Sequence, residues 1–186
     1  VKNIDLNEVI SGIQLQLLTY LDATCENNDV DPAGILYFNL IEPIVKKYKP
    51  LSKEELEEEI KKKFKMNGLI LADINVIKLM DKNLTQGYSD SIPVYIGKNG
   101  ELSTSNSSTI TKEQFVYLQK YVRKIVKEIA KEIYNGNIGA VPYYNTKTQM
   151  NACKYCEFNS VCQFDAKLSG NKYNYIKNLK IESILD

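Results

Sequence analysis

Three cysteines lie close together in the segment NACKYCEFNSVCQFD, where Cys153, Cys156 and Cys162 form the pattern C-x2-C-x5-C. Thiolates at these spacings reach a common point from a tight loop followed by a helical turn, which is the ligand geometry of zinc and iron–sulfur sites. Closed sites of either kind need four ligands, and Cys25 is the one other cysteine. The alternative is free thiols, or a disulfide in a secreted chain. The spacing favours a metal or cluster site without choosing between zinc and iron.

The composition excludes several classes of function. Lys and Arg number 24 against 23 Asp and Glu, so a nucleic-acid partner has to be recognised by a local patch. The chain has no histidine, which rules out Ser-His-Asp, Cys-His and His-ligated zinc catalysis within these residues. It also has no glycine motif of the kind that cradles phosphates.

Length and termini set the broad class. The 186 residues suffice for one domain with a sizeable core. There is no run of about 18 apolar residues and no secretory signal, so we expect a cytoplasmic protein without a membrane partner. The sequence begins at Val1 rather than at a methionine, from which we expect a processed product or a fragment of a longer protein.

Hydrophobic periodicity predicts an α/β fold that is rich in helix. Apolar residues recur at helical spacing over 7–23, and the apolar run 33–41 between two prolines is typical of a buried strand. Ser52 and Glu55 form a capping box that opens a helix over 52–65.

The second half of the chain continues this pattern. Gly68 is expected to break the chain before a short helix over 72–80, and the polar stretch 101–109 is the best candidate for disorder. The longest helix is expected from Thr111 to residue 134, ended by a glycine of the NGNIG segment. Its predicted core face consists of Phe115, Leu118, Val122, Ile125, Ile129 and Ile133.

Two polar features lie on these helices. Gln16 and Tyr20 are four residues apart at the edge of an apolar stripe, where they can bond a phosphate, steady a catalytic group, or simply mark the helix boundary. Four lysines share a narrow arc of the longest helix and either track a phosphate backbone or form a solvated face. These lysines are Lys120, Lys124, Lys127 and Lys131.

Acidic residues do not form a convincing two-metal site. Asp22, Asp29 and Asp31 cluster at a helix end and turn, while Asp73 and Asp81 flank a short helix. No carboxylates with a nearby Lys fall on successive predicted strands. If the chain belongs to a magnesium nuclease, its magnesium ligands are not visible in these residues.

Taken together, these segments resemble one family. GIQLQLLTYLDA matches the Q-x-x-x-Y motif of RecB-like nucleases, with Gln16 and Tyr20 in the motif positions. DPAGILYFNLIEP, KMNGLILAD, KLMD and ACKYCEFNSVCQFD follow in the order seen in the AddB family, the B subunits of bacterial AddAB ATP-dependent helicase/deoxyribonucleases. The resemblance extends to about Tyr173, and its cysteine pattern is more specific than Q-x-x-x-Y.

The resemblance implies a fold and a cluster. Residues 1–186 would be the C-terminal part of a PD-(D/E)xK nuclease domain of restriction-endonuclease type, with an iron–sulfur segment at 150–166 and a tail at 170–186. The cysteine triplet would bind a [4Fe-4S] cluster that staples distant segments together. Its fourth ligand would lie far upstream of this chain, because Cys25 is not at the matching position.

The resemblance also implies an activity. The family's catalytic Asp and Lys would lie immediately before Val1, in a protein that hydrolyses DNA with Mg²⁺ during double-strand break repair and recombination, paired with an ATP-dependent AddA subunit. Gln16 and Tyr20 would support that active site. The chain alone is then expected to be inactive, with an absent or incomplete cluster, and to self-associate through an exposed sheet edge.

Three competing hypotheses remain. The first is a short RecB-like nuclease of CRISPR adaptation, which shares both motifs. The second is a non-enzymatic zinc module that uses Cys25 as the fourth ligand and serves as a scaffold or DNA-binding platform. The third is a degenerate nuclease domain retained for its structure.

Overall fold

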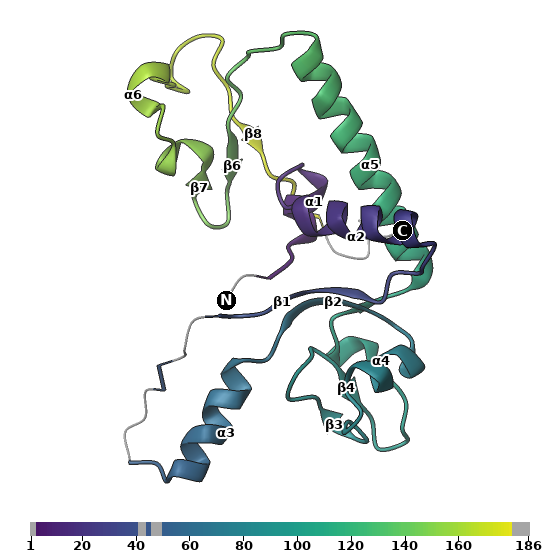
Figure 1. The fold of residues 1–186 in the computed structure, drawn as a ribbon. Helices are drawn as coiled ribbons and strands as arrows, with labels where there is room; N and C mark the ends of the chain where they lie inside the picture. The colour runs from purple at the N-terminus through teal and green to yellow at the C-terminus, as the bar shows by residue number, and fades with distance from the viewer. Residues whose placement is uncertain (1–2, 41–43, 46–49, 180–186) are drawn as a thin grey trace. The chain divides into compact units, whose positions relative to one another are not determined.

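The computed structural model describes residues 3–40, 44–45 and 50–179, and Figure 1 shows their fold. These residues divide into two compact units. The first unit contains residues 3–4 and 16–120, and the second contains 5–15 and 121–179. No helix among the described residues is long and apolar enough to cross a membrane.

The first unit is built on a three-stranded mixed sheet in the order β1-β2-β5. β1 and β2 are antiparallel, with Ile35 opposite Leu69, whereas β2 and β5 are parallel. The strand expected over 33–41 is confirmed in its first half, residues 38–40 are not in a strand, and residue 41 lies outside the described residues. The strands are β1 (Gly34–Tyr37), β2 (Asn67–Leu71) and β5 (Thr109–Ile110).

The prediction that Gly68 breaks the chain is wrong, because Gly68 lies inside β2 and pairs with Leu36. Its φ of 153° belongs to a region that side chains rarely allow. A Cβ at this position would stand 2.0 Å from the Ile35 carbonyl oxygen. The glycine is therefore needed for the close approach of two backbones.

A hydrophobic core packs beside this sheet. It contains α4 (Ile74–Met80) and the hairpin of β3 (Gly87–Tyr88) and β4 (Tyr95–Ile96). The short helix is confirmed, and Asp73 caps it by accepting a hydrogen bond from the Asn75 N–H over 2.7 Å. The core side chains are Ile70, Ile77, Leu84, Ile92, Val94 and Ile96.

The polar stretch 101–109 has a defined structure, so the prediction of disorder is wrong. It contains a 3-10 turn, η1 (Thr104–Asn106). The Tyr95 N–H donates to Ser107 Oγ over 2.8 Å, and the Ser108 N–H donates to the Pro93 carbonyl over 2.8 Å. These bonds fasten the turn to the hairpin.

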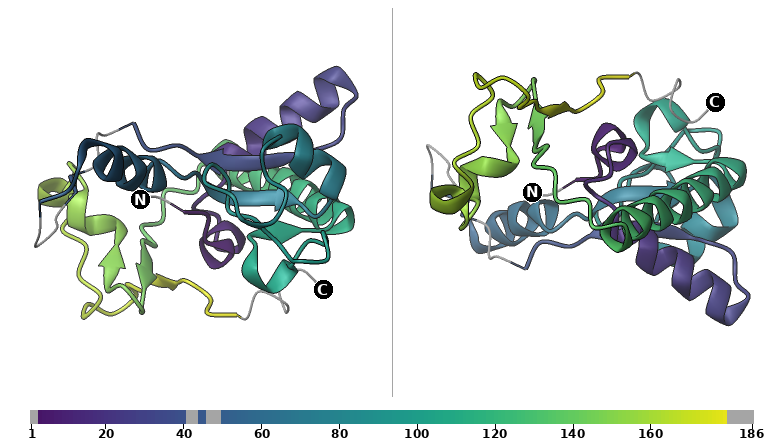
Figure 2. Two further views of the ribbon diagram at one scale, coloured as in Figure 1. Left: turned by 90° about the horizontal axis from the view of Figure 1, so that it is seen from below. Right: turned by 90° about the horizontal axis from the view of Figure 1, so that it is seen from above.

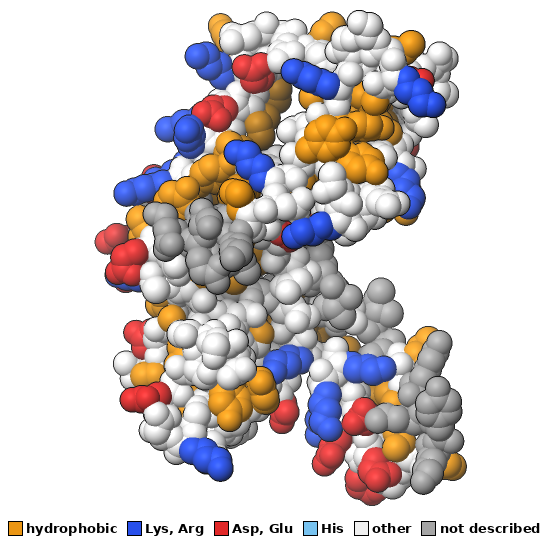
Figure 3. Space-filling model, turned by 180° about the vertical axis from the view of Figure 1, so that it is seen from behind, with side chains coloured by type: hydrophobic (Ala, Val, Ile, Leu, Met, Phe, Trp, Pro, Cys, Tyr) orange, Lys and Arg blue, Asp and Glu red, His pale blue; other side chains and the backbone are white. Residues whose placement is uncertain are grey.

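Two helices complete the first unit: α2 (Gln16–Asn28) and α3 (Lys53–Lys63). The capping box of α3 is confirmed, because Ser52 and Glu55 exchange hydrogen bonds of 3.2 and 2.8 Å. Acidic and basic side chains both cover α3, as Figure 3 shows.

The expected helix over 7–23 is in fact two helices, α1 (Leu6–Ile10) and α2. The Ser11 hydroxyl donates to the Asn7 carbonyl over 2.7 Å at the end of α1. Gly12 follows with φ +81°, a conformation that glycine adopts readily. This turn separates two helices whose combined apolar pattern looks continuous in the sequence.

The longest helix is α5 (Lys112–Tyr134), whose first turns belong to the first unit and the rest to the second. Thr111 and Gln114 cap its start with reciprocal hydrogen bonds, and Gly136 with φ +71° follows its end. The predicted core face is half right. Phe115, Leu118 and Val122 are buried, whereas Ile129 and Ile133 are 44% and 73% exposed.

The second unit has a small sheet in the order β7-β6-β8, and Figure 2 shows it from two further sides. Asn7 of α1 exchanges hydrogen bonds with the backbone of Leu179, at 2.8 and 3.3 Å. Besides α1 and the later turns of α5, the second unit contains β6 (Tyr143–Asn145), β7 (Met150–Asn151), η2 (Ala152–Tyr155), α6 (Asn159–Cys162) and β8 (Asn174–Tyr175).

Candidate functional site

The Q-x-x-x-Y pair lies on successive turns of α2. Gln16 Nε2 donates a hydrogen bond to the Tyr20 hydroxyl over 3.0 Å. Both side chains are exposed, Tyr20 by 59%, while Leu18 between them is buried. Because the tyrosine oxygen accepts this bond, its own hydrogen can serve an external acceptor. The pair therefore presents donors of the kind that bind a phosphate oxygen.

The cysteine segment folds locally as its spacing predicts. Asn151 Oδ1 accepts hydrogen bonds from the N–H groups of Cys153 and Lys154, at 2.9 and 3.1 Å, and so caps η2. The short helix α6 then carries Cys162, whose N–H donates to the Phe158 carbonyl over 2.9 Å. A tight loop followed by a helical turn is the arrangement expected from C-x2-C-x5-C.

The three cysteines line one pocket of about 260 Å³. Burial raises the pKa of the Cys153 thiol, and the nearby Cys156 and Cys162 raise that pKa further. The remaining lining is apolar: Ala140, Val141, Pro142, Ala152 and Phe164. Cys156 and Cys162 are nevertheless exposed, and Cys153 is partly buried.

An aromatic cluster supports this pocket. Phe164 packs against Tyr173 with a centroid distance of 5.1 Å, and Tyr173 in turn contacts Tyr144 at 5.1 Å and Tyr175 at 6.2 Å. Burial raises the pKa of Tyr173, and Cys153 adds to the effect. The rings thus connect the cysteine loop to the β6–β8 sheet, over which side chains coloured as hydrophobic gather in Figure 3.

The donor set fits a cluster or zinc in type but not in number. Thiolates are the ligands that both prefer, and the triplet supplies three of the usual four. Within the described ranges, no three His, Cys, Asp or Glu side chains are arranged to hold a metal ion. The three cysteines thus line one pocket, but their side chains are not arranged as a metal site in this structure.

Cys25 lies on α2 in the first unit. Burial raises the pKa of its thiol, the charges of Asp22 and Asp31 raise it further, and a hydrogen bond with Gln119 partly offsets both. A raised pKa disfavours the thiolate that binds metal. The pKa of Cys153 is raised as well, so the direction of the shift does not separate Cys25 from the triplet.

The carboxylates that the sequence singled out have structural tasks. Asp31 forms an ion pair with Lys112 at 2.6 Å, and Asp73 caps α4. Asp81 Oδ2 accepts a 2.6 Å hydrogen bond from the Ser89 hydroxyl, which also accepts from the buried Ile92 N–H. Among the described residues, no three His, Cys, Asp or Glu side chains form a group that could hold a metal ion.

The lysine stripe is exposed along α5, on the side of the helix opposite Phe115, Leu118 and Val122. Lys124 lies 3.9 Å from Glu128, an exposed i,i+4 pair that contributes little to stability. Exposure leaves both hypotheses for the stripe open, so DNA contact by Lys120, Lys124, Lys127 and Lys131 stays a prediction.

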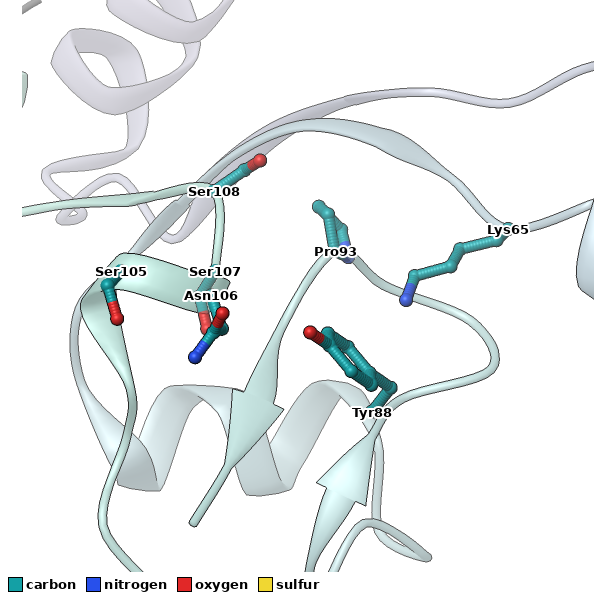
Figure 4. Close-up of a pocket in the computed structure, with 7 residues that line it drawn as sticks. All are labelled: Lys65, Tyr88, Pro93, Ser105, Asn106, Ser107 and Ser108. Atoms are coloured by element: carbon teal, nitrogen blue, oxygen red, sulfur yellow. The ribbon is translucent and has the colours of Figure 1, made fainter.

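The sequence did not single out a polar pocket in the first unit, which Figure 4 shows. It is lined by Lys65, Tyr88, Pro93 and the turn 105–108. The available signal was the basic run KKKFK, which ends at Lys65. The contribution of the distant Tyr88 and of the serine-rich turn depends on tertiary packing, which no local pattern encodes.

Comparison with known proteins gives a family and relatives. A family model described as the PD-(D/E)XK nuclease superfamily matches residues 2–163. The chain is also similar to proteins named as the B subunit of an ATP-dependent helicase/deoxyribonuclease. It is 45% identical over 98% of its length to that of Thermoanaerobacter sp. (strain X514), and 45% over 96% to that of Clostridium kluyveri (strain NBRC 12016). The similar protein of Bacillus mycoides (strain KBAB4) is 43% identical over 96% of the chain.

The chain spans only 16% of the length of each of these relatives. Similarity thus covers nearly all of this chain and a small part of theirs.

Proposed function

The chain belongs to the PD-(D/E)XK nuclease superfamily, and from this premise we propose that it is the C-terminal part of the nuclease domain in the B subunit of an ATP-dependent helicase/deoxyribonuclease. The whole protein would hydrolyse phosphodiester bonds of DNA in the cytoplasm, together with a helicase partner of the AddA type, during break repair and recombination. The observation that carries the proposal is continuous similarity to the B-subunit relatives over nearly the whole chain. The expected PD-(D/E)xK family is thereby confirmed.

In this proposal α2 contributes the Q-x-x-x-Y pair to the active site. The Gln16–Tyr20 hydrogen bond holds the two side chains in register on one exposed side of the helix. Together they donate to a phosphate oxygen or orient a neighbouring catalytic group. Their role is to position, because neither side chain is a base or a metal ligand of the usual kind.

The cysteine triplet would hold three corners of a [4Fe-4S] cluster. A bound cluster supplies a cross-link between chain segments, and its fourth ligand would come from the longer protein. The Asn151 cap and the Phe164–Tyr173 contact keep the three thiols on one pocket beforehand. Such preorganisation lowers the entropy lost on binding.

Magnesium does not fit the described residues, which lack a group of ligands for it. The catalytic Asp and Lys are proposed to lie in the segment that precedes Val1 in the longer protein. The chain alone should accordingly leave linear DNA intact in the presence of Mg²⁺, and magnesium-dependent degradation by pure chain would contradict this assignment.

The proposal is tested in the full-length protein by combining iron analysis with a nuclease assay on linear duplex DNA. Cys156→Ser should remove the cluster, seen as lost iron and lost visible absorbance, and should lower nuclease activity. Cys25→Ser is the matched control and should leave both unchanged. If Cys25→Ser instead releases a metal, and that metal is zinc, the non-enzymatic zinc module is correct.

A further inference from the structure

The polar pocket of the first unit brings together residues from separate parts of the chain around a space of about 300 Å³. Lys65 follows α3, Tyr88 lies in β3, and Asn106 ends η1. In Figure 4 the Lys65 ammonium and the Tyr88 hydroxyl point into the space that Asn106 faces from the other side. Ser105 also lines it, whereas the Ser107 hydroxyl accepts from the Tyr95 N–H over 2.8 Å, and Asn106 Nδ2 donates one hydrogen to Ser103 Oγ over 3.1 Å.

The pocket carries one positive charge and several neutral donors. Lys65 is the sole charged residue among the described residues that line it. Its ammonium lies 5.4 Å from the centroid of the Tyr88 ring, a cation–π contact that holds it near the pocket. The negative charge that acts on Lys65 is that of Asp90, which lines another pocket of this unit instead. A cation with hydroxyl and amide donors is the set that binds a phosphate.

The surroundings favour a phosphate that belongs to a polymer. That other pocket is lined by Lys61 and by Phe38 and Phe64, whose rings stack with a centroid distance of 5.8 Å. Phe38 and Tyr88 are 55% and 61% exposed. Exposed aromatic rings alternating with lysines are typical of surfaces that bind single-stranded nucleic acid, because rings stack on bases while lysines pair with phosphates.

We propose that this pocket binds a phosphate of single-stranded DNA, with Lys65 pairing to the charge and Tyr88 and Asn106 donating hydrogen bonds. The adjacent nucleotide would lie against Phe38 and Lys61. The choice of DNA over another phosphate polymer rests on the proposed function. The pocket would contact the DNA strand through residues that belong to neither the Q-x-x-x-Y motif nor the cysteine motif.

The test measures binding of a fluorescent oligo-dT to the 186-residue chain by anisotropy, in EDTA so that no hydrolysis occurs. Lys65→Gln should weaken binding about tenfold, the effect of one charge-assisted hydrogen bond. It should also lower the slope of log affinity against log salt by about 0.7, as expected for one lost phosphate contact on a single strand. The matched control is Lys78→Gln, an exposed lysine on α4 outside the pocket, which should change neither.

A second variant guards against misfolding. Ser105 is exposed on the turn, so Ser105→Glu places a carboxylate beside the pocket without disturbing the core, and it should also weaken binding. Wild-type affinity in both Lys65→Gln and Ser105→Glu would overturn the proposal. So would binding of free dTMP as tight as that of the oligonucleotide, since a free nucleotide would then be the ligand. A full-length protein without nuclease activity would refute the proposed function and leave this binding result untouched.

Discussion

Gly68 offers a sharp test of the first unit, because the pairing of β1 and β2 depends on the absence of a side chain there. The perturbation is Gly68→Ala. Its Cβ would lie 2.0 Å from the Ile35 carbonyl oxygen and 2.9 Å from the Leu36 Cα. Both atoms belong to the backbone of β1, so no side-chain rotation can relieve the contact.

The cost has two parts. A residue with a side chain at φ 153° adopts a backbone conformation that costs about 1–3 kcal/mol. Ordinary carbon–oxygen contacts are about 3.3 Å, so the strands would also have to separate by more than about 1 Å. Overpacking of this kind costs a further 1–3 kcal/mol or so. We expect a loss of roughly 2–6 kcal/mol in total, a large part of the stability of a domain.

The assay is thermal unfolding of the 186-residue chain followed by circular dichroism. At about 2–4 °C per kcal/mol for a chain of this size, the expected loss corresponds to a fall in Tm of roughly 4–24 °C. Gly87→Ala is the matched control. Gly87 also has a positive φ, of 88°, but its Cβ would meet no heavy atom within 4 Å. That variant carries the conformational cost alone, and its Tm should fall by about 3 °C.

The difference in Tm between Gly68→Ala and Gly87→Ala measures the cost of the close approach of β1 and β2. If Gly68→Ala melts within about 2 °C of Gly87→Ala, β1 does not lie against β2 in the register described, and the sheet assignment fails. Loss of amide protection confined to Leu69 and Ile70 in the Gly68→Ala chain would support the steric explanation.

Three further outcomes are expected. Phe115→Ala should lower the free energy of unfolding by about 3–5 kcal/mol, because Phe115 is fully buried. Ile133→Ala, at a 73% exposed position, should change it by less than about 0.5 kcal/mol. Urea titration of both variants measures the difference. Ser52→Ala should cost about 1 kcal/mol by removing the α3 cap, seen as reduced helicity, and an unchanged spectrum and midpoint would contradict the capping box. Tyr20→Phe removes the hydroxyl that Gln16 bonds and should lower nuclease activity of the full-length protein about tenfold with little change in Tm; full activity would remove the pair from the site.

Features encoded by neighbouring residues were predictable from the sequence. The Ser52 cap needs a partner only three residues away and forms as expected, and the helix expected from Thr111 begins beside an equally local Thr111–Gln114 cap. The cysteine loop likewise depends on residues within one short segment, which explains why its local shape follows from its spacing.

Features that depend on distant contacts were not predictable. Gly68 looks like a chain break until β1 is placed against it. The turn at Gly12 interrupts an apolar pattern that looks like one helix, and only the structure assigns α1 and α2 to different units. Ile129 and Ile133 follow the core period of α5, yet they stay exposed within the described part of the chain. Periodicity identifies an apolar face but not what covers it.

The last prediction concerns the cysteine triplet. Its three cysteines lie in one short segment, whereas the fourth ligand that would complete a metal site does not. Cys153, Cys156 and Cys162 line one pocket of a locally folded loop, so a metal can recruit all three once their side chains rearrange. A small monothiol in solution can then act as the fourth ligand. We expect the 186-residue chain to bind Co²⁺ weakly, with intense thiolate absorption developing only as the monothiol is added, and Cys25→Ser should behave as wild type. Full absorption without added thiol, lost in Cys25→Ser, would instead show that Cys25 closes the site, and the fourth ligand would not have to come from a longer protein.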